Sequence, residues 1–321
     1  MSRLFSAACL LFIALSLNAA AQTQPQPQLR VLTSIKPLQL IAAAVQDGLG
    51  EPEVLLPPGA SPHHYALRPS DVRRVRDADL LYWIGPDLES FLPRVLNGRA
   101  KTSVKVQDLP GMSLRHFADA HANEHADHDE EHDAHAEMAD QHDHDHRPGS
   151  LDAHLWLLPA NALVIARKMA ADLAVADPAN TARYQANVEA FASRLAALDQ
   201  RLKSRLQGLA DKPYFVFHEA YDYFEAAYGL KHAGVFSVLG EVQPGAKHVA
   251  AMRERLQQAG PTCVFSEPPL LPRLAKTLTA GLPVTLAEMD AMGGSLPVNA
   301  KGYEALLDNL ADELAGCLEA L

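Results

Sequence analysis

The chain has 321 residues, of which 48% are hydrophobic and 21% charged, and its formal net charge is −11 at pH 7. These proportions are typical of a globular protein of about two domains. The negative charge argues against a nucleic-acid-binding protein, because such proteins usually present a basic face.

The N-terminus has the pattern of a secretory signal peptide. Arg3 supplies the positive end, residues 4–17 form a short apolar run, and Ala19-Ala20-Ala21 fits a cleavage site. The apolar run is too short for a membrane anchor. We therefore expect residues 1–21 to be removed and the mature protein to lie in the periplasm.

The first half alternates short β-rich runs with helical patterns, after a polar lead-in over 22–28. Such alternation is typical of a parallel α/β sheet. The expected strands are 30–35, 53–56, 80–84 and 103–106, and the expected helices are 38–45, 70–76 and 88–96.

Two helices are expected in the middle of the chain, over 160–175 and from Pro178 to about 207. In the second, apolar residues recur every three or four positions, which indicates one buried face. At 1.5 Å per residue this helix would be about 40 Å long. We expect it to be a rigid connection between two lobes, and an ordinary surface helix of one lobe is the alternative.

The second half repeats the alternation. Strands are expected at 214–217, 233–236, 263–266 and 283–286, with helices at 220–228, 247–258, 272–280 and 303–318. The prediction is an α/β protein of two (β/α)4 lobes, each with a four-stranded, mostly parallel sheet. Its parts are an N-terminal lobe (22–177), a linker helix (178–210) and a C-terminal lobe (211–321).

Four potential metal ligands follow strands of the two halves. They are His64, His154, His218 and Asp290. Ligands bind beyond the carboxyl ends of the strands in open α/β sheets, so a site between the lobes would gather these side chains. Three imidazoles with a carboxylate or water form a zinc-type ligand set. His232 and His248 are interpreted as structural or exposed.

Residues 116–146 hold 11 acidic residues, no Lys or Arg, and nine of the 15 histidines. With so little apolar surface, the segment 116–148 is expected to be a disordered loop. Histidine-rich tracts bind metals, and an inert linker is the alternative. The auxiliary ligands would be His116, His121, His125, His128, His132, His135, His142, His144 and His146.

Two cysteines remain in the mature chain, Cys263 and Cys317. In an oxidising compartment a lone pair of cysteines indicates a disulfide, and two unrelated buried thiols are the alternative.

Several motifs together resemble the zinc-uptake ABC transporter substrate-binding proteins. They include EVLLPPGASPHHYALRPSDV, DAHLWLLP, YFVFHEAYDYFE, EVQPGAKH and TCVFSEP. The resemblance implies a monomeric receptor that binds Zn2+ in an inter-lobe cleft and delivers it to an inner-membrane permease with a separate ATPase.

The resemblance places the family's three histidines at His64, His154 and His218. Manganese and iron members carry Glu where His218 stands, so zinc is favoured. Two departures leave the fourth ligand open between Asp290, His63 and water: His63 stands where an acidic residue was expected, and the loop around Asp290 lacks the family's Pro.

Two other functions are considered. A zinc hydrolase would also use three histidines and water, but the segment after His218 does not form an H-E-x-x-H motif, so we expect no enzyme. A periplasmic zinc buffer or adhesin would depend on the histidine-rich segment alone.

Overall fold

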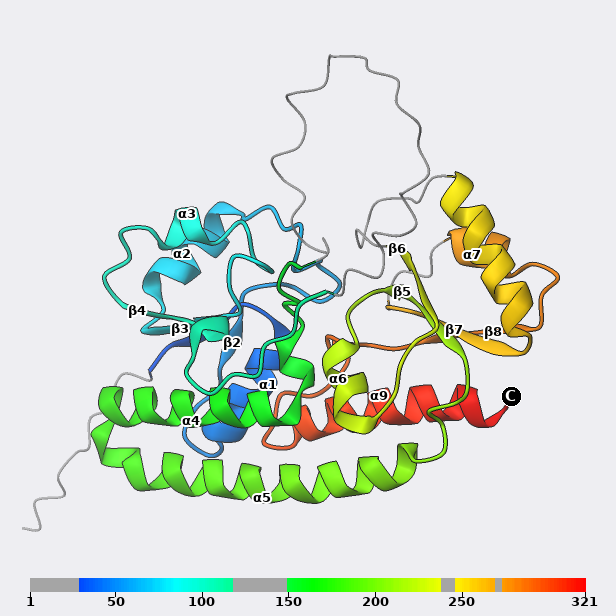
Figure 1. The fold of residues 1–321 in the computed structure, drawn as a ribbon. Coiled ribbons are helices and arrows are strands. Elements are labelled where there is room, and N and C mark those ends of the chain that lie inside the picture. The colour runs from blue at the N-terminus through cyan, green and yellow to red at the C-terminus, as the bar shows by residue number, and fades with distance from the viewer. Residues whose placement is uncertain (1–28, 118–148, 238–245, 269–272) are drawn as a thin grey trace, which may run out of the picture.

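The computed structural model describes residues 29–117, 149–237, 246–268 and 273–321. They form two four-stranded sheets, with strand orders β2-β1-β3-β4 and β6-β5-β7-β8. Every pair of neighbouring strands is parallel. This confirms the predicted α/β architecture of two lobes (Figure 1).

The first lobe follows the predicted alternation of strands and helices. The elements are β1 (Val31–Thr33), α1 (Lys36–Val45), β2 (Glu53–Val54), α2 (Pro69–Asp77), β3 (Leu80–Trp83), α3 (Pro93–Leu96) and β4 (Thr102–Lys105), with a 3-10 turn η1 (Val106–Asp108) after them.

The prediction of a helix over 88–96 is wrong, because α3 begins only at Pro93. Proline lacks the backbone N–H and suits the first position of a helix. Just before it, the buried Glu89 carboxylate accepts hydrogen bonds from the amides of Ile84 and Gly85, which fixes this stretch as a turn.

The second lobe also follows the prediction. Its elements are β5 (Tyr214–His218), α6 (Asp222–Tyr228), β6 (Gly234–Ser237), α7 (Ala246–Ala259), β7 (Thr262–Ser266), α8 (Arg273–Thr279), β8 (Val284–Glu288) and α9 (Gly302–Glu319).

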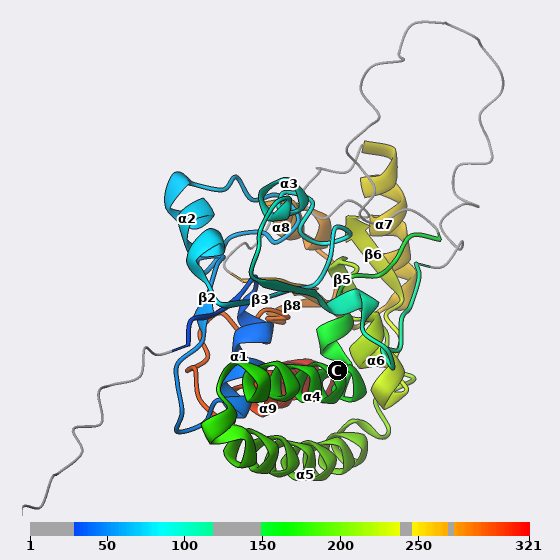
Figure 2. The ribbon, with the colours of Figure 1, turned by 90° about the vertical axis from the view of Figure 1, so that its left-hand side faces the viewer.

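Between the sheets in sequence, the described part of the chain forms η3 (Leu155–Leu157), α4 (Pro159–Ala176), the 3-10 turn η4 (Pro178–Asn180) and the 26-residue helix α5 (Thr181–Leu206). Helix α5 packs against α4 and α9 and runs below both lobes (Figures 1 and 2). The apolar positions predicted to face the core are all buried: Tyr184, Val188, Phe191, Leu195, Leu198, Leu202 and Leu206. The prediction of a long helix joining the lobes is confirmed.

The two lobes share one hydrophobic core rather than meeting at a polar interface. A single cluster of buried residues includes Leu81 of β3, Leu195 of α5 and Leu310 of α9. Hydrogen bonds also cross between the halves: for example, Trp156 Nε1 donates to Ala291 O at 2.9 Å, and Tyr303 OH donates to Trp156 O at 2.6 Å. Separating the lobes would expose this core, so wide hinge motion is disfavoured.

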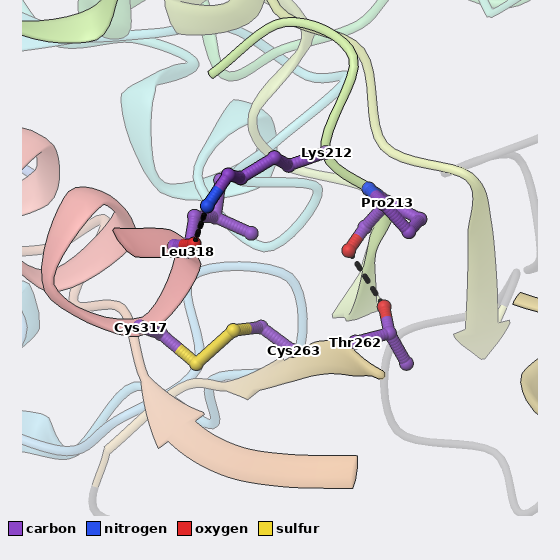
Figure 3. The surroundings of a disulfide bond; sticks show 6 residues. All are labelled: Lys212, Pro213, Thr262, Cys263, Cys317 and Leu318. Atoms are coloured by element: carbon purple, nitrogen blue, oxygen red, sulfur yellow. Dashed lines mark hydrogen bonds between the residues drawn. A yellow bond between two sulfur atoms is a disulfide. The ribbon is translucent and has the colours of Figure 1, made fainter. Parts of the chain in front are cut away.

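A disulfide joins Cys263 in β7 to Cys317 in α9, with the Cα atoms 6.2 Å apart (Figure 3). The predicted pairing is confirmed. Beside it, Lys212 Nζ donates to Leu318 O, so the end of α9 is attached both to the sheet and to the segment before β5. None of the described helices is long and apolar enough to span a membrane.

Candidate metal centre

Three histidines from distant parts of the chain meet between the two sheets. His63 lies in the loop after β2, His154 directly precedes η3, and His218 is the last residue of β5. One potential ligand nitrogen of each lies within 4.8 Å of the others. In each sheet the strands are parallel, so their carboxyl ends lie along one edge. His63 and His218 lie at these edges of the two sheets.

The imidazole rings are close and well shielded. The ring centroids are 5.4 Å apart for His63 and His154, 5.4 Å for His63 and His218, and 4.9 Å for His154 and His218. His63 is 7% exposed and His154 only 2%. Trp156 packs edge-on against His154 with a centroid distance of 5.3 Å.

Asp152 holds His154 in place. Its Oδ1 accepts a hydrogen bond from the backbone N–H of His154 at 2.9 Å and lies 2.8 Å from Nδ1 of the same residue. When Asp152 is ionised, its carboxylate can only accept, so Nδ1 then carries the hydrogen and Nε2 offers its lone pair. Burial raises the pKa of Asp152 well above its usual range, and the charges of Asp222 and Glu219 contribute to the rise.

Glu267 plays the same part for His218, with Oε1 lying 2.9 Å from Nδ1. Tyr221 OH also donates to this oxygen, at 3.4 Å. Burial alone would raise the pKa of Glu267, but the charge and hydrogen bond of His218, with the charge of His63, lower it overall. The Glu267 side chain is therefore a carboxylate beside two of the three histidines.

The structure differs from the expectation at the loop after β2. His63, considered only as an alternative fourth donor, lies in the three-histidine group, whereas His64 is exposed and outside it. The two rings are 6.4 Å apart. The side chains of two successive residues leave the backbone in different directions, so at this bend only one of them faces the site.

Asp290 is also outside the group found among the described residues. Its carboxylate is occupied by its own loop: Oδ1 accepts from the amides of Met292 and Gly293 at 2.9 and 2.8 Å, and Oδ2 accepts from Gly294 at 2.8 Å. Its contacts are those of a residue that fixes a turn.

Of the predicted auxiliary ligands, only His116 is described, and it is exposed and paired with Leu151 by an antiparallel bridge. The other eight, from His121 to His146, lie outside the described residues, as does the predicted signal peptide.

Sequence reasoning missed Asp152 and Glu267. Both stand in segments that carried the resemblance, DAHLWLLP and TCVFSEP. The D-x-H spacing of Asp152 and His154 was a usable signal, because a carboxylate two residues from a ligand can hold its imidazole. No spacing signal connects Glu267 with His218, which is 49 residues away.

Known proteins resemble this chain over most of its length. The family model described as "Zinc-uptake complex component A periplasmic" matches residues 31–317. The high-affinity zinc uptake system protein ZnuA of Yersinia pestis is 37% identical over 291 residues, covering 90% of this chain and 91% of the relative. The Brucella abortus protein of the same name is 36% identical over 304 residues, with the same coverage of both chains.

The fold is shared with a solved crystal structure of ZnuA. Its TM-score is 0.73 at 21% identity, and the match covers 91% of this chain and 100% of that one. Proteins of this kind are periplasmic transport receptors that work with an ABC permease and ATPase, and they are not enzymes. The sequence match over nearly the whole described chain is decisive: this protein belongs to the ZnuA family of zinc-binding ABC transporter substrate-binding proteins.

Proposed function

We propose that the protein captures Zn2+ at His63, His154 and His218 and delivers it to an inner-membrane ABC permease driven by a separate ATPase. The observation that supports this best is the convergence of three imidazoles, from both halves of the chain, within 4.8 Å.

The donor set fits zinc. Nitrogen donors from three imidazoles are typical of Zn2+, whereas Mn2+ prefers oxygen donors. Asp152 and Glu267 hold Nδ1 of His154 and His218, so Nε2 of each would bind the metal. When both are ionised, the two carboxylates together balance the 2+ charge of the ion in this shielded place.

Binding would need only small movements. Three nitrogens on one tetrahedral zinc lie about 3.4 Å apart, as Zn–N bonds of about 2.1 Å require. In the structure, the potential ligand nitrogens of the three histidines lie within 4.8 Å of one another, which is little more than 1 Å wider. The shared core and the long α5 helix favour such local closure over hinge bending of the lobes.

For the fourth position we propose a water molecule. The oxygens of Asp290 are held by three loop amides, so ligation by Asp290 would sacrifice bonds that already stabilise its turn. His64 is exposed beside the site and is proposed to contact incoming zinc rather than to enclose it.

The surrounding biology follows the same proposal. Residues 1–21 would be a cleavable signal peptide, and the mature receptor, with its lobes at 22–177 and 211–321 and the linker at 178–210, would act as a monomer. The histidine-rich segment 116–148, most of which lies outside the described residues, would collect zinc with lower affinity than the three-histidine centre.

A zinc titration of the metal-free mature chain, with Mn2+ as competitor, tests the proposal. The wild type, a deletion of 116–146 and His218→Ala should be compared. We expect one tight, zinc-selective site that survives the deletion and is lost in His218→Ala. Binding that vanishes with the segment and ignores His218 would instead identify a buffer or adhesin that uses the histidine-rich tract.

A further inference from the structure

A second group of metal-ligating side chains lies in the C-terminal lobe. Glu219, Asp222 and His232 place one ligand atom each within 4.8 Å of the others. Glu219 follows His218 at the end of β5, Asp222 begins α6, and His232 precedes β6. Three separate local structures therefore bring one nitrogen and two carboxylate donors to one point.

His232 is fixed in orientation by a third carboxylate, that of Glu225. Its Nδ1 lies 3.0 Å from each oxygen of Glu225, and its backbone N–H donates to Oε1 at 3.2 Å. Glu225 is itself anchored, because Tyr214 OH donates to Oε1 at 2.6 Å from within β5. With Nδ1 held, Nε2 is the nitrogen that can serve a cation, as in carboxylate–histidine–metal arrangements.

Negative charge is concentrated here in a poorly solvated place. Glu219 is 6% exposed and Glu225 only 3%. Burial first, and then the charges of Glu225 and Glu219, raise the pKa of Asp222 to about 6, although His232 and Arg115 act in the opposite direction. Three carboxylates face one imidazole, and buried like charges at this separation are costly unless a cation balances them.

We propose that Glu219, Asp222 and His232 form a second divalent-cation site, separate from the three-histidine centre. One nitrogen and two oxygen donors suit Mn2+, Fe2+ or Zn2+ and make the site less zinc-selective than three imidazoles. The hydrogen bonds of His232 to Glu225 agree with the structural role expected from the sequence, and the proposal adds a ligand role to it.

Hydrogen bonds connect the proposed site to the residues that flank the histidine-rich segment. Tyr223, the neighbour of Asp222, accepts a hydrogen bond from Arg115 N at 2.8 Å and donates to Asp152 O at 2.9 Å. These two residues precede and follow the segment. A cation at this site would be bound by Glu219, which directly follows His218 in the sequence. It would also lie beside the segment that carries His154.

The competing interpretation is a metal-free network in which protonated His232 neutralises the carboxylates. A Mn2+ titration of the full mature chain separates the two, with free Mn2+ followed by electron paramagnetic resonance after one equivalent of Zn2+ has been added. The variants are Asp222→Asn and His232→Gln. Asp308→Asn is the matched control, because Asp308 is an exposed carboxylate paired only with Arg201 among the described side chains.

The acidic histidine-rich segment is present in all four proteins and contributes the same background. We expect wild type and Asp308→Asn to bind one more Mn2+ than the two site variants, or to bind it at least tenfold more tightly. An anomalous Mn peak between Asp222 and His232 in crystals would agree. Coincident isotherms for all four proteins would overturn the proposal, provided that circular dichroism and binding of the first zinc show the variants to be folded.

Discussion

Asp152 Oδ1 lies 2.8 Å from Nδ1 of His154, and both residues are almost fully buried. Their contact turns an imidazole that could adopt either tautomer into one whose Nε2 is the acceptor. The two residues are close in sequence, since only Ala153 separates them. Their contact becomes relevant to metal binding because the fold brings His63 and His218 next to His154.

Asp152→Asn should weaken zinc binding about tenfold to a hundredfold. The amide oxygen can still accept from Nδ1, but the negative charge that favours the bound cation is lost. A competitive titration with a zinc chelator measures the effect. Asp308→Asn, at an exposed carboxylate, is the control, and equal affinities for the two variants would contradict the assigned role.

His63→Ala and His64→Ala should differ sharply, although they change neighbouring residues. His63→Ala removes a buried donor of the three-histidine group, and we expect a loss of zinc affinity of at least a hundredfold. His64→Ala changes an exposed side chain and should alter affinity by less than about fivefold. Isothermal titration of both variants decides the matter, and the reverse order would restore His64 as the ligand.

Asp290→Ala should act on stability more than on zinc. Three backbone amides lose their acceptor, and at about 1 kcal/mol for each hydrogen bond the variant should be destabilised by about 1–3 kcal/mol. Thermal unfolding of the metal-free protein measures this loss. A large fall in zinc affinity at unchanged stability would instead make Asp290 a ligand.

Removing the disulfide by the paired change Cys263→Ser and Cys317→Ser should lower the free energy of unfolding by about 4 kcal/mol. The bond closes a loop between residues 54 positions apart, and the entropy of the unfolded chain rises when that constraint is lost. Denaturant unfolding gives the difference. Zinc affinity at 25 °C should stay within about twofold, because neither cysteine touches the three histidines.

Glu89 should make stability depend on pH. Complete burial raises its pKa to about 7, against which hydrogen bonds from Gly85, Ser34 and Ile84 act. The folded state therefore holds a proton that the unfolded state releases near pH 4.5, and stability falls as pH rises from about 4.5 to 7. The shift corresponds to about 3 kcal/mol at most.

The side chain introduced by Glu89→Gln resembles the protonated form of Glu89 at every pH. The variant should therefore lack the fall in stability that the release of this proton causes in the wild type. Denaturant unfolding of the metal-free protein at pH 5 and pH 8 gives the free energy of unfolding at each pH, for the variant and for the wild type. Glu254→Gln, at an exposed position of α7, is the control and should leave the decline unchanged. A variant that loses as much stability between the two pH values as the wild type would refute the assignment.

The alternation of strands and helices, the buried face of α5, the cysteine pair and the family could all be predicted from the sequence. The first two depend on periodicity within one segment, the cysteine pair on a count of cysteines, and the family on several motifs along the chain. The prediction of a helix over 88–96 was wrong because the buried Glu89 carboxylate accepts hydrogen bonds from the amides of Ile84 and Gly85. Local helix propensity does not encode this contact.

Which donors converge depends on the three-dimensional packing and could not be predicted from the sequence. Sequence spacing could not distinguish His63 from His64, because the direction of a side chain in a loop is set by the packing around it. The pairing of Glu267 with His218 and the gathering of Glu219, Asp222 and His232 join separate elements of the second lobe. Such convergence requires atoms to be placed within a few ångströms, and that placement comes from the shared core that holds the two lobes together.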